Sequence, residues 1–172
     1  MPLGKFRNGY CYEWAGATGS LLYQDNGYPP FSQLLTATMS EAEILLVKKS
    51  WTKLQGIDPA LMADLFYTKL FASQPVLRKM FPADMEMQHQ KLMDMLNVIV
   101  TRLDLLHEIS PDISTMGDRH TGYGVKPLHY DCVGTALLWT LEKGIGKEWN
   151  APLAAAWEKC YNTIALQMSI TP

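Results

Sequence analysis

The sequence lacks the features that mark membrane proteins, secreted disulfide-rich proteins and nucleic-acid-binding proteins. No apolar run approaches the roughly 20 residues that span a bilayer, and the first residues lack the basic start and apolar stretch of a secretory signal. The three cysteines form no spaced pair, so neither a disulfide framework nor a zinc site is predicted. A formal net charge of −2 gives no electrostatic reason to expect nucleic acid or an anionic membrane as partner. We therefore expect a cytoplasmic protein.

The composition fits one globular domain preceded by a segment of different character. The chain has 172 residues, of which 48% are hydrophobic and 19% charged. A chain of this length can bury about two-thirds of the surface that it exposes when unfolded. In residues 1–38, glycine and proline recur without a helical or strand period, although aromatic side chains are frequent. We expect residues 1–38 to be a largely irregular N-terminal extension, either poorly ordered or an artefact of an upstream start codon. Residues 39–172 are expected to form the domain.

From Met39 onward, the sequence predicts one helix after another. Ser40 and Glu43 form a capping box ahead of an apolar face with helical spacing. Asp58 is an N-cap, and Pro59 then occupies the first turn of a second helix. These local signals fix two helix starts before any tertiary packing is considered.

The remaining segments also have helical spacing, and none alternates convincingly enough to be a strand. Further helices are predicted over these approximate ranges: 75–81, 85–107, 110–120, 127–143 and 152–170. Several of these helices are too short for a regular four-helix bundle, and steep crossings around a pocket fit their unequal lengths better. The predicted fold class is all-α.

His120 is the most informative residue, at the predicted end of the helix over 110–120. A neutral imidazole that projects from a helix into an apolar pocket is the usual way in which proteins hold haem iron from one side. A lone histidine is more often a hydrogen-bonded surface or core residue, so the interpretation depends on the surrounding sequence.

Six short segments occur in a specific order and spacing around His120. They are LFYTKLF (65–71), QP (74–75), MFP (80–82), QHQKLM (88–93), RHTGYGV (119–125) and HYDCVG (129–134). Each is weak alone, but together they resemble the globin family over 39–170. The resemblance is closest to bacterial single-domain globins and to the haem domain of flavohaemoglobins, and it implies a globin fold.

The resemblance implies a haem b cofactor whose iron is held by His120 as the proximal ligand. Arg119 would pair with a haem propionate, although a solvated arginine is an equal alternative. Phe81 matches the aromatic residue that wedges against the porphyrin, a role compatible with ordinary core packing. Apolar positions over and beneath the ring are implied at these residues: Leu92, Val125 and Val133.

Tyr67 and Gln88 carry the functional distinction within the resemblance. A tyrosine at this spacing before Phe81 is implied to point its hydroxyl into the distal pocket. Gln88 lies four residues before Leu92, on the same helical face. Two donors in a pocket of low dielectric would stabilise the negative charge that O2 acquires on binding ferrous haem. The rival distal residue is His89, which would give a six-coordinate haem of the neuroglobin kind. We favour Gln88 and expect His89 to face outward or to lie at the helix edge.

One departure from the flavohaemoglobin pattern concerns the proximal side. Tyr130 matches the tyrosine that, in flavohaemoglobins, acts with a glutamate from the end of the last helix around the proximal histidine. This chain has already reached Thr171 and Pro172 where the glutamate is expected, and no residue replaces it. A peroxidase-like increase in electron donation from the histidine is therefore not expected.

The sequence leaves several functions open. The first is reversible O2 binding for storage, transport or sensing, with O2, NO or CO as small ligands. The alternative is nitric oxide dioxygenation, with a separate reductase as partner. A third is a regulatory module with a globin fold and no haem, which the presence of His120 and Phe81 disfavours.

Overall fold

The computed structural model describes residues 39–169, which are helical and contain no strand. The expected extension over 1–38 lies outside the described residues. The main helices are α2 (Glu41–Leu54), α3 (Pro59–Ser73), α4 (Glu86–Thr101), α5 (Leu106–Gly122), α6 (Pro127–Ile145) and α7 (Ala151–Ser169). Short 3-10 helices lie between them: η1 (Pro75–Met80), η2 (Leu103–Leu105) and η3 (Gly146–Glu148). The predicted all-α class is confirmed. Among these helices, none combines the length and apolar character needed to cross a bilayer.

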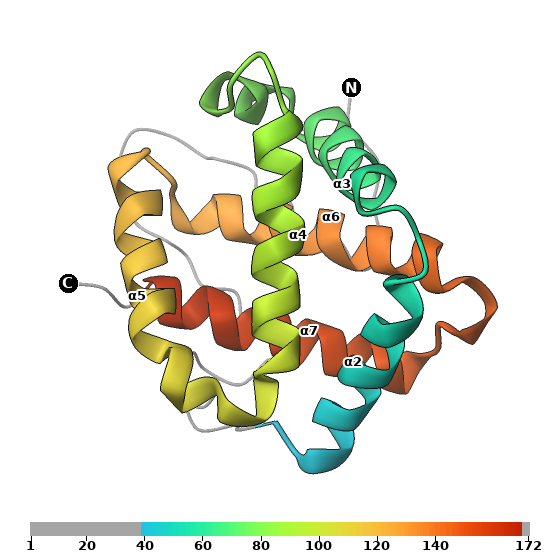
Figure 1. The fold of residues 1–172 in the computed structure, drawn as a ribbon. Helices are drawn as coiled ribbons and strands as arrows, with labels where there is room; N and C mark the ends of the chain where they lie inside the picture. The colour runs from blue at the N-terminus through green and yellow to red at the C-terminus, as the bar shows by residue number, and fades with distance from the viewer. Residues whose placement is uncertain (1–38, 170–172) are drawn as a thin grey trace, which may run out of the picture. The chain divides into compact units, whose positions relative to one another are not determined.

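The helices cross one another steeply. Figure 1 shows α4 passing in front of α6 and α7, with α5 at one edge and α2 and α3 at the other. The helix α6 packs against both α3 and α7, while α5 packs chiefly against α7. Steep crossings of this kind leave room for a pocket between helices, which a parallel bundle with a continuous core seam does not.

The two predicted helix starts are confirmed in atomic detail. The Ser40 hydroxyl accepts from the backbone N–H of Glu43, whose carboxylate accepts from the backbone N–H of Ser40. At the start of α3, the Asp58 carboxylate accepts from the N–H of Ala60, and Pro59 occupies the first helical position. Both starts satisfy backbone donors that have no partner within the helix.

The helix that carries His120 begins earlier than the sequence predicts. The expected helix over 85–107 ends at Thr101, and α5 starts at Leu106, so Pro111 lies inside it. Proline is unfavourable inside a helix because it lacks an N–H. Here burial of Ile109 and Ile113 outweighs that preference, since both pack in one apolar cluster.

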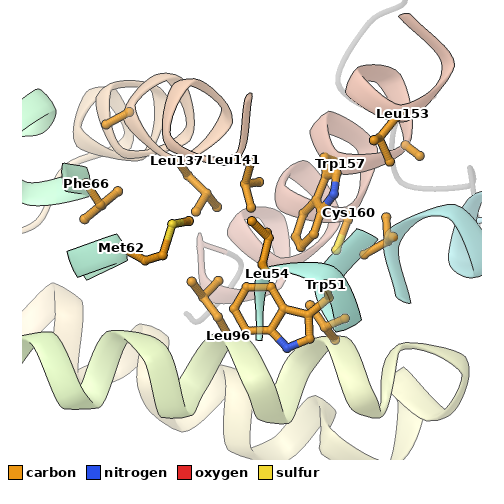
Figure 2. Packing of buried hydrophobic residues seen from close by; sticks show 14 of the residues in the cluster. Trp51, Leu54, Met62, Phe66, Leu96, Leu137, Leu141, Leu153, Trp157 and Cys160 are labelled. Carbon is orange, nitrogen blue, oxygen red and sulfur yellow. The ribbon is translucent and has the colours of Figure 1, made fainter. Parts of the chain in front are cut away.

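The main core lies between α2, α3, α4, α6 and α7. Its members include Trp51, Leu54, Met62, Phe66, Leu96, Leu137, Leu141, Leu153, Trp157 and Cys160, shown in Figure 2. The Trp51 and Trp157 ring centroids are 6.1 Å apart, and Trp157 Nε1 donates to the Ser50 hydroxyl over 2.9 Å. Cys160 is a small buried residue of this core, and its burial raises the pKa of the thiol to about 12.

A second, smaller core cluster joins α4, α5 and α7, and α5 approaches α7 closely at Gly117. A Cβ atom on Gly117 would lie 2.2 Å from the carbonyl oxygen of Met168. Glycine inside a helix costs about 1 kcal/mol relative to alanine, so the close crossing is what requires glycine here. Because Gly117 precedes His120 by three residues in α5, this contact also fixes the position of the histidine.

We predict that Gly117→Ala lowers the free energy of unfolding by about 1–3 kcal/mol, because the added methyl group forces α5 away from α7. Urea titration followed by circular dichroism measures the loss. The matched control is Gly122→Ala at the end of the same helix, where a Cβ atom meets nothing within 4 Å. An equal loss of stability in both variants would contradict the role of Gly117.

Candidate functional site

His120 is held in one tautomer by its own helix. It lies half-buried near the end of α5, with Nδ1 2.7 Å from the carbonyl oxygen of Met116, one turn earlier. A carbonyl can only accept, so Nδ1 carries the proton and donates, and Nε2 keeps a free lone pair. Metal-ligating histidines usually have this arrangement, in which the second nitrogen donates to a carbonyl or carboxylate. The backbone N–H of Val125 also donates to the His120 carbonyl over 3.0 Å, which keeps that residue close.

Tyr130 lies against the His120 ring. The two ring centroids are 6.3 Å apart and the planes are inclined by 30°. The backbone of Tyr130 is fixed by Tyr161, whose hydroxyl donates to the Tyr130 carbonyl over 2.6 Å. Burial raises the pKa of the Tyr130 phenol, while a hydrogen bond with the Ser169 side chain lowers it.

Ser169 is a residue that sequence reasoning missed. We expected no side chain of the last helix to replace the absent glutamate, and no carboxylate does so among the described residues of α7. The Ser169 hydroxyl, which donates to the Ala165 carbonyl over 2.7 Å, instead lies close enough to lower the pKa of the Tyr130 phenol. No sequence signal marks this serine, because the pairing depends on how α6 and α7 cross.

Tyr67 and Gln88 meet across α3 and α4. Gln88 Nε2 donates to the Tyr67 hydroxyl oxygen over 3.1 Å, and Tyr67 is only 5% exposed. Burial raises the pKa of the Tyr67 phenol, and the hydrogen bond from Gln88 lowers it. The hydroxyl is therefore protonated near neutral pH. Since it accepts from Gln88, its own hydrogen is available to a further acceptor.

An aromatic frame surrounds the Tyr67 ring. Phe71 stacks on it with centroids 5.7 Å apart, and Phe81 meets it edge-on at 5.5 Å. Phe71 and Phe81 also contact each other, edge-on at 5.3 Å. Phe71, Phe81 and Tyr67 thus make three mutual ring contacts, which leave the phenol little freedom to tilt.

His89 lies differently from our expectation. We expected it to face outward or towards the helix edge, but it is half-buried and its ring stacks on Tyr67, with centroids 5.3 Å apart and planes inclined by 12°. The crossing of α3 and α4 is the reason, because it brings two consecutive residues of α4 against one tyrosine. Gln88 touches the hydroxyl and His89 touches the ring face.

The other predicted residues fall into two surroundings. Leu92 and Val133 are half-buried and pack on the main core. Arg119 is exposed and lines a crevice of about 400 Å³ between α4 and α5. Buried or half-buried side chains of the same crevice are apolar: Met95, Ile99, Ile109, Ile113 and Met116.

The residues present fit a haem group. The crevice between α4 and α5 has an apolar floor and a charged rim of Asp94, Asp112 and Arg119. It is lined by neither His120 nor Tyr67, so the fit depends on the histidine and not on this crevice. Within 39–169 no three His, Cys, Asp or Glu side chains gather into a cluster that could hold a metal ion. One histidine with a free Nε2 is the donor set for iron whose other ligands come from a macrocycle.

Comparison with known proteins places these features in one family. The family model described as Globin matches residues 64–168. Neuroglobin-1 of Oncorhynchus mykiss is 27% identical over 145 residues, covering 76% of this chain and 91% of that protein. The flavohemoprotein of Bacillus subtilis (strain 168) is 29% identical over 103 residues, covering 58% of this chain and 26% of that protein.

A solved structure extends the likeness to three dimensions. It is an engineered carbene transferase, RmaNOD, described as a putative nitric oxide dioxygenase from Rhodothermus marinus. The two chains are 26% identical with a TM-score of 0.69, and the match covers 77% of this chain and 92% of that one. The arrangement of helices in Figure 1 is thus shared with a bacterial relative.

Proposed function

The chain belongs to the globin family, and we propose that it binds haem b through His120 and uses the haem to bind O2 reversibly. The observation that carries this proposal is the Tyr67–Gln88 hydrogen bond, which prepares a protonated hydroxyl as a donor in a buried site. When bound, ferrous haem supplies the iron that takes up O2, NO or CO. His120 would hold the iron, and Tyr67 and Gln88 would supply the hydrogen-bond donors for the ligand.

On the proximal side, His120 contributes Nε2, and its Nδ1 donates to Met116. A carbonyl acceptor leaves the imidazole neutral, whereas a carboxylate would draw the proton away and make the ring a stronger electron donor. Tyr130 adds a rigid wall whose hydroxyl is partnered by a serine. This proximal side favours reversible ligand binding over activation of the O–O bond.

On the distal side, Gln88 orients the Tyr67 hydroxyl by donating to its oxygen, and that hydroxyl would donate to a ligand that carries partial negative charge. A hydrogen bond to a charged acceptor in a buried site contributes about 1.5–3 kcal/mol. Slow release of O2 is therefore expected.

We predict that His120→Ala abolishes stable haem retention, because Nε2 of His120 is the iron ligand. The Soret absorbance per protein after gel filtration measures retention, and added imidazole should restore it. The control is His107→Ala, which removes an exposed histidine from the same helix. A Soret band unchanged in His120→Ala would refute the assignment. Wild-type protein without a Soret band after haem supplementation would favour the haem-free regulatory module.

We predict that Tyr67→Phe speeds O2 dissociation about tenfold or more, because one charge-assisted hydrogen bond is lost. Haem content should not change, since Phe keeps the ring contacts with Phe71 and Phe81. Stopped-flow displacement of O2 by CO measures the rate. The control is Tyr123→Phe, at a side chain that is 70% exposed. An unaltered rate in Tyr67→Phe would show that the hydroxyl does not reach the ligand.

The second candidate function is nitric oxide dioxygenation, in which NO and O2 combine to nitrate and one electron is returned by a separate reductase. The likeness to a structure named as a nitric oxide dioxygenase supports it. Steady consumption of NO with a cellular reductase separates the two functions. Many turnovers per protein favour the enzyme, and a single turnover favours reversible O2 binding.

A further inference from the structure

Arg78 lies in η1, and its guanidinium donates hydrogen bonds to the backbone of residues 81–83, the segment that follows η1. Its Nη1 donates to the carbonyl oxygens of Phe81 and Pro82 over 3.1 Å and 2.8 Å, and its Nη2 donates to that of Ala83 over 3.1 Å. Three consecutive carbonyls therefore share one guanidinium. At the far end of the segment, the Asp84 carboxylate accepts from the backbone N–H of Glu86 and holds the start of α4.

This set of hydrogen bonds depends on the shape of the arginine side chain. A guanidinium is planar and presents several N–H donors in a fixed fork, so it can serve carbonyls that point in different directions. An ammonium group on a flexible stem is a single point of donation and does not reproduce that geometry. The segment over 81–83 has no regular secondary structure. Its backbone carbonyls are therefore held by the hydrogen bonds from Arg78 and not by the backbone hydrogen bonds of a helix.

Two routes connect Arg78 to the Tyr67 hydroxyl. The first runs through the segment over 81–83, because Phe81 belongs to it and its ring meets the Tyr67 ring edge-on, with centroids 5.5 Å apart. The second runs through Phe71, because the guanidinium lies 5.4 Å over its ring and Phe71 in turn stacks on Tyr67. Arg78 therefore contacts two of the four rings that surround Tyr67, or their backbone, and the other two rings are Phe66 and His89.

We propose that Arg78 is a positioning residue for the distal donor: it fixes Phe71 and Phe81, and these fix the direction of the Tyr67 hydroxyl. This inference rests on the proposed function. It assigns to Arg78 a share in setting how tightly O2 is held. Arg78 makes no hydrogen bond to Tyr67 or Gln88, so its effect must pass through the two rings.

The test is a double-mutant cycle on O2 dissociation in the haem-loaded full chain. Arg78→Gln should speed dissociation about three- to tenfold in wild-type protein, and it should change little in the Tyr67→Phe background, where the positioned hydroxyl is absent. The C–O stretching frequency of the CO-loaded protein should shift towards the value of Tyr67→Phe. The matched control is Lys79→Gln, which removes the adjacent exposed cation, and it should leave rate and frequency unchanged.

Other outcomes would overturn the proposal. An equal acceleration by Arg78→Gln in both backgrounds would mean a general loosening of the pocket, and no acceleration in wild type would mean no coupling. If Arg78→Gln does not fold, the test uses Arg78→Lys in its place. If Arg78→Lys releases O2 at the wild-type rate, the forked geometry of the guanidinium is not required and the proposal is refuted. Failure of the proposed function looks different, because then Tyr67→Phe itself leaves O2 dissociation unchanged.

Discussion

The hydrogen bond from His120 Nδ1 to the Met116 carbonyl is the interaction on which the site depends. It fixes which imidazole nitrogen is free and which way the ring faces. The bond lies within one helix, so its direction relative to the rest of the protein is set by where α5 lies. That position is fixed by the contact of Gly117 with the Met168 backbone, and Tyr161 fixes Tyr130 against the His120 ring.

The two sides of the proposed haem site are built differently. The proximal side is held by α7, through the Gly117 contact, the Tyr161 hydroxyl and the Ser169 side chain. The distal side is held by aromatic stacking around Tyr67 and by the hydrogen bonds of Arg78 to a non-helical segment. Both Tyr67 and Tyr130 are phenols whose pKa burial raises, so each remains a neutral hydroxyl near neutral pH.

Signals that act over a few residues were readable from the sequence. The capping box at Ser40 and the N-cap at Asp58 are local hydrogen bonds, and both are present as predicted. The start of α5 was misplaced because Pro111 reads as a helix start, while burial of Ile109 extends the helix past it. At Pro111, tertiary packing outweighs the low helix propensity of proline.

Features that depend on helix crossings were not readable. Consecutive residues on a helix point about 100° apart, so the choice between Gln88 and His89 turned on the crossing of α3 and α4. The structure brings both against Tyr67, the amide to its hydroxyl and the imidazole to its ring.

The most direct test of the account is the absorption spectrum of the ferrous protein without added ligand. A five-coordinate, high-spin haem that becomes six-coordinate with O2 is the predicted result, and a low-spin bis-histidine spectrum that His89→Ala converts to high spin would contradict it.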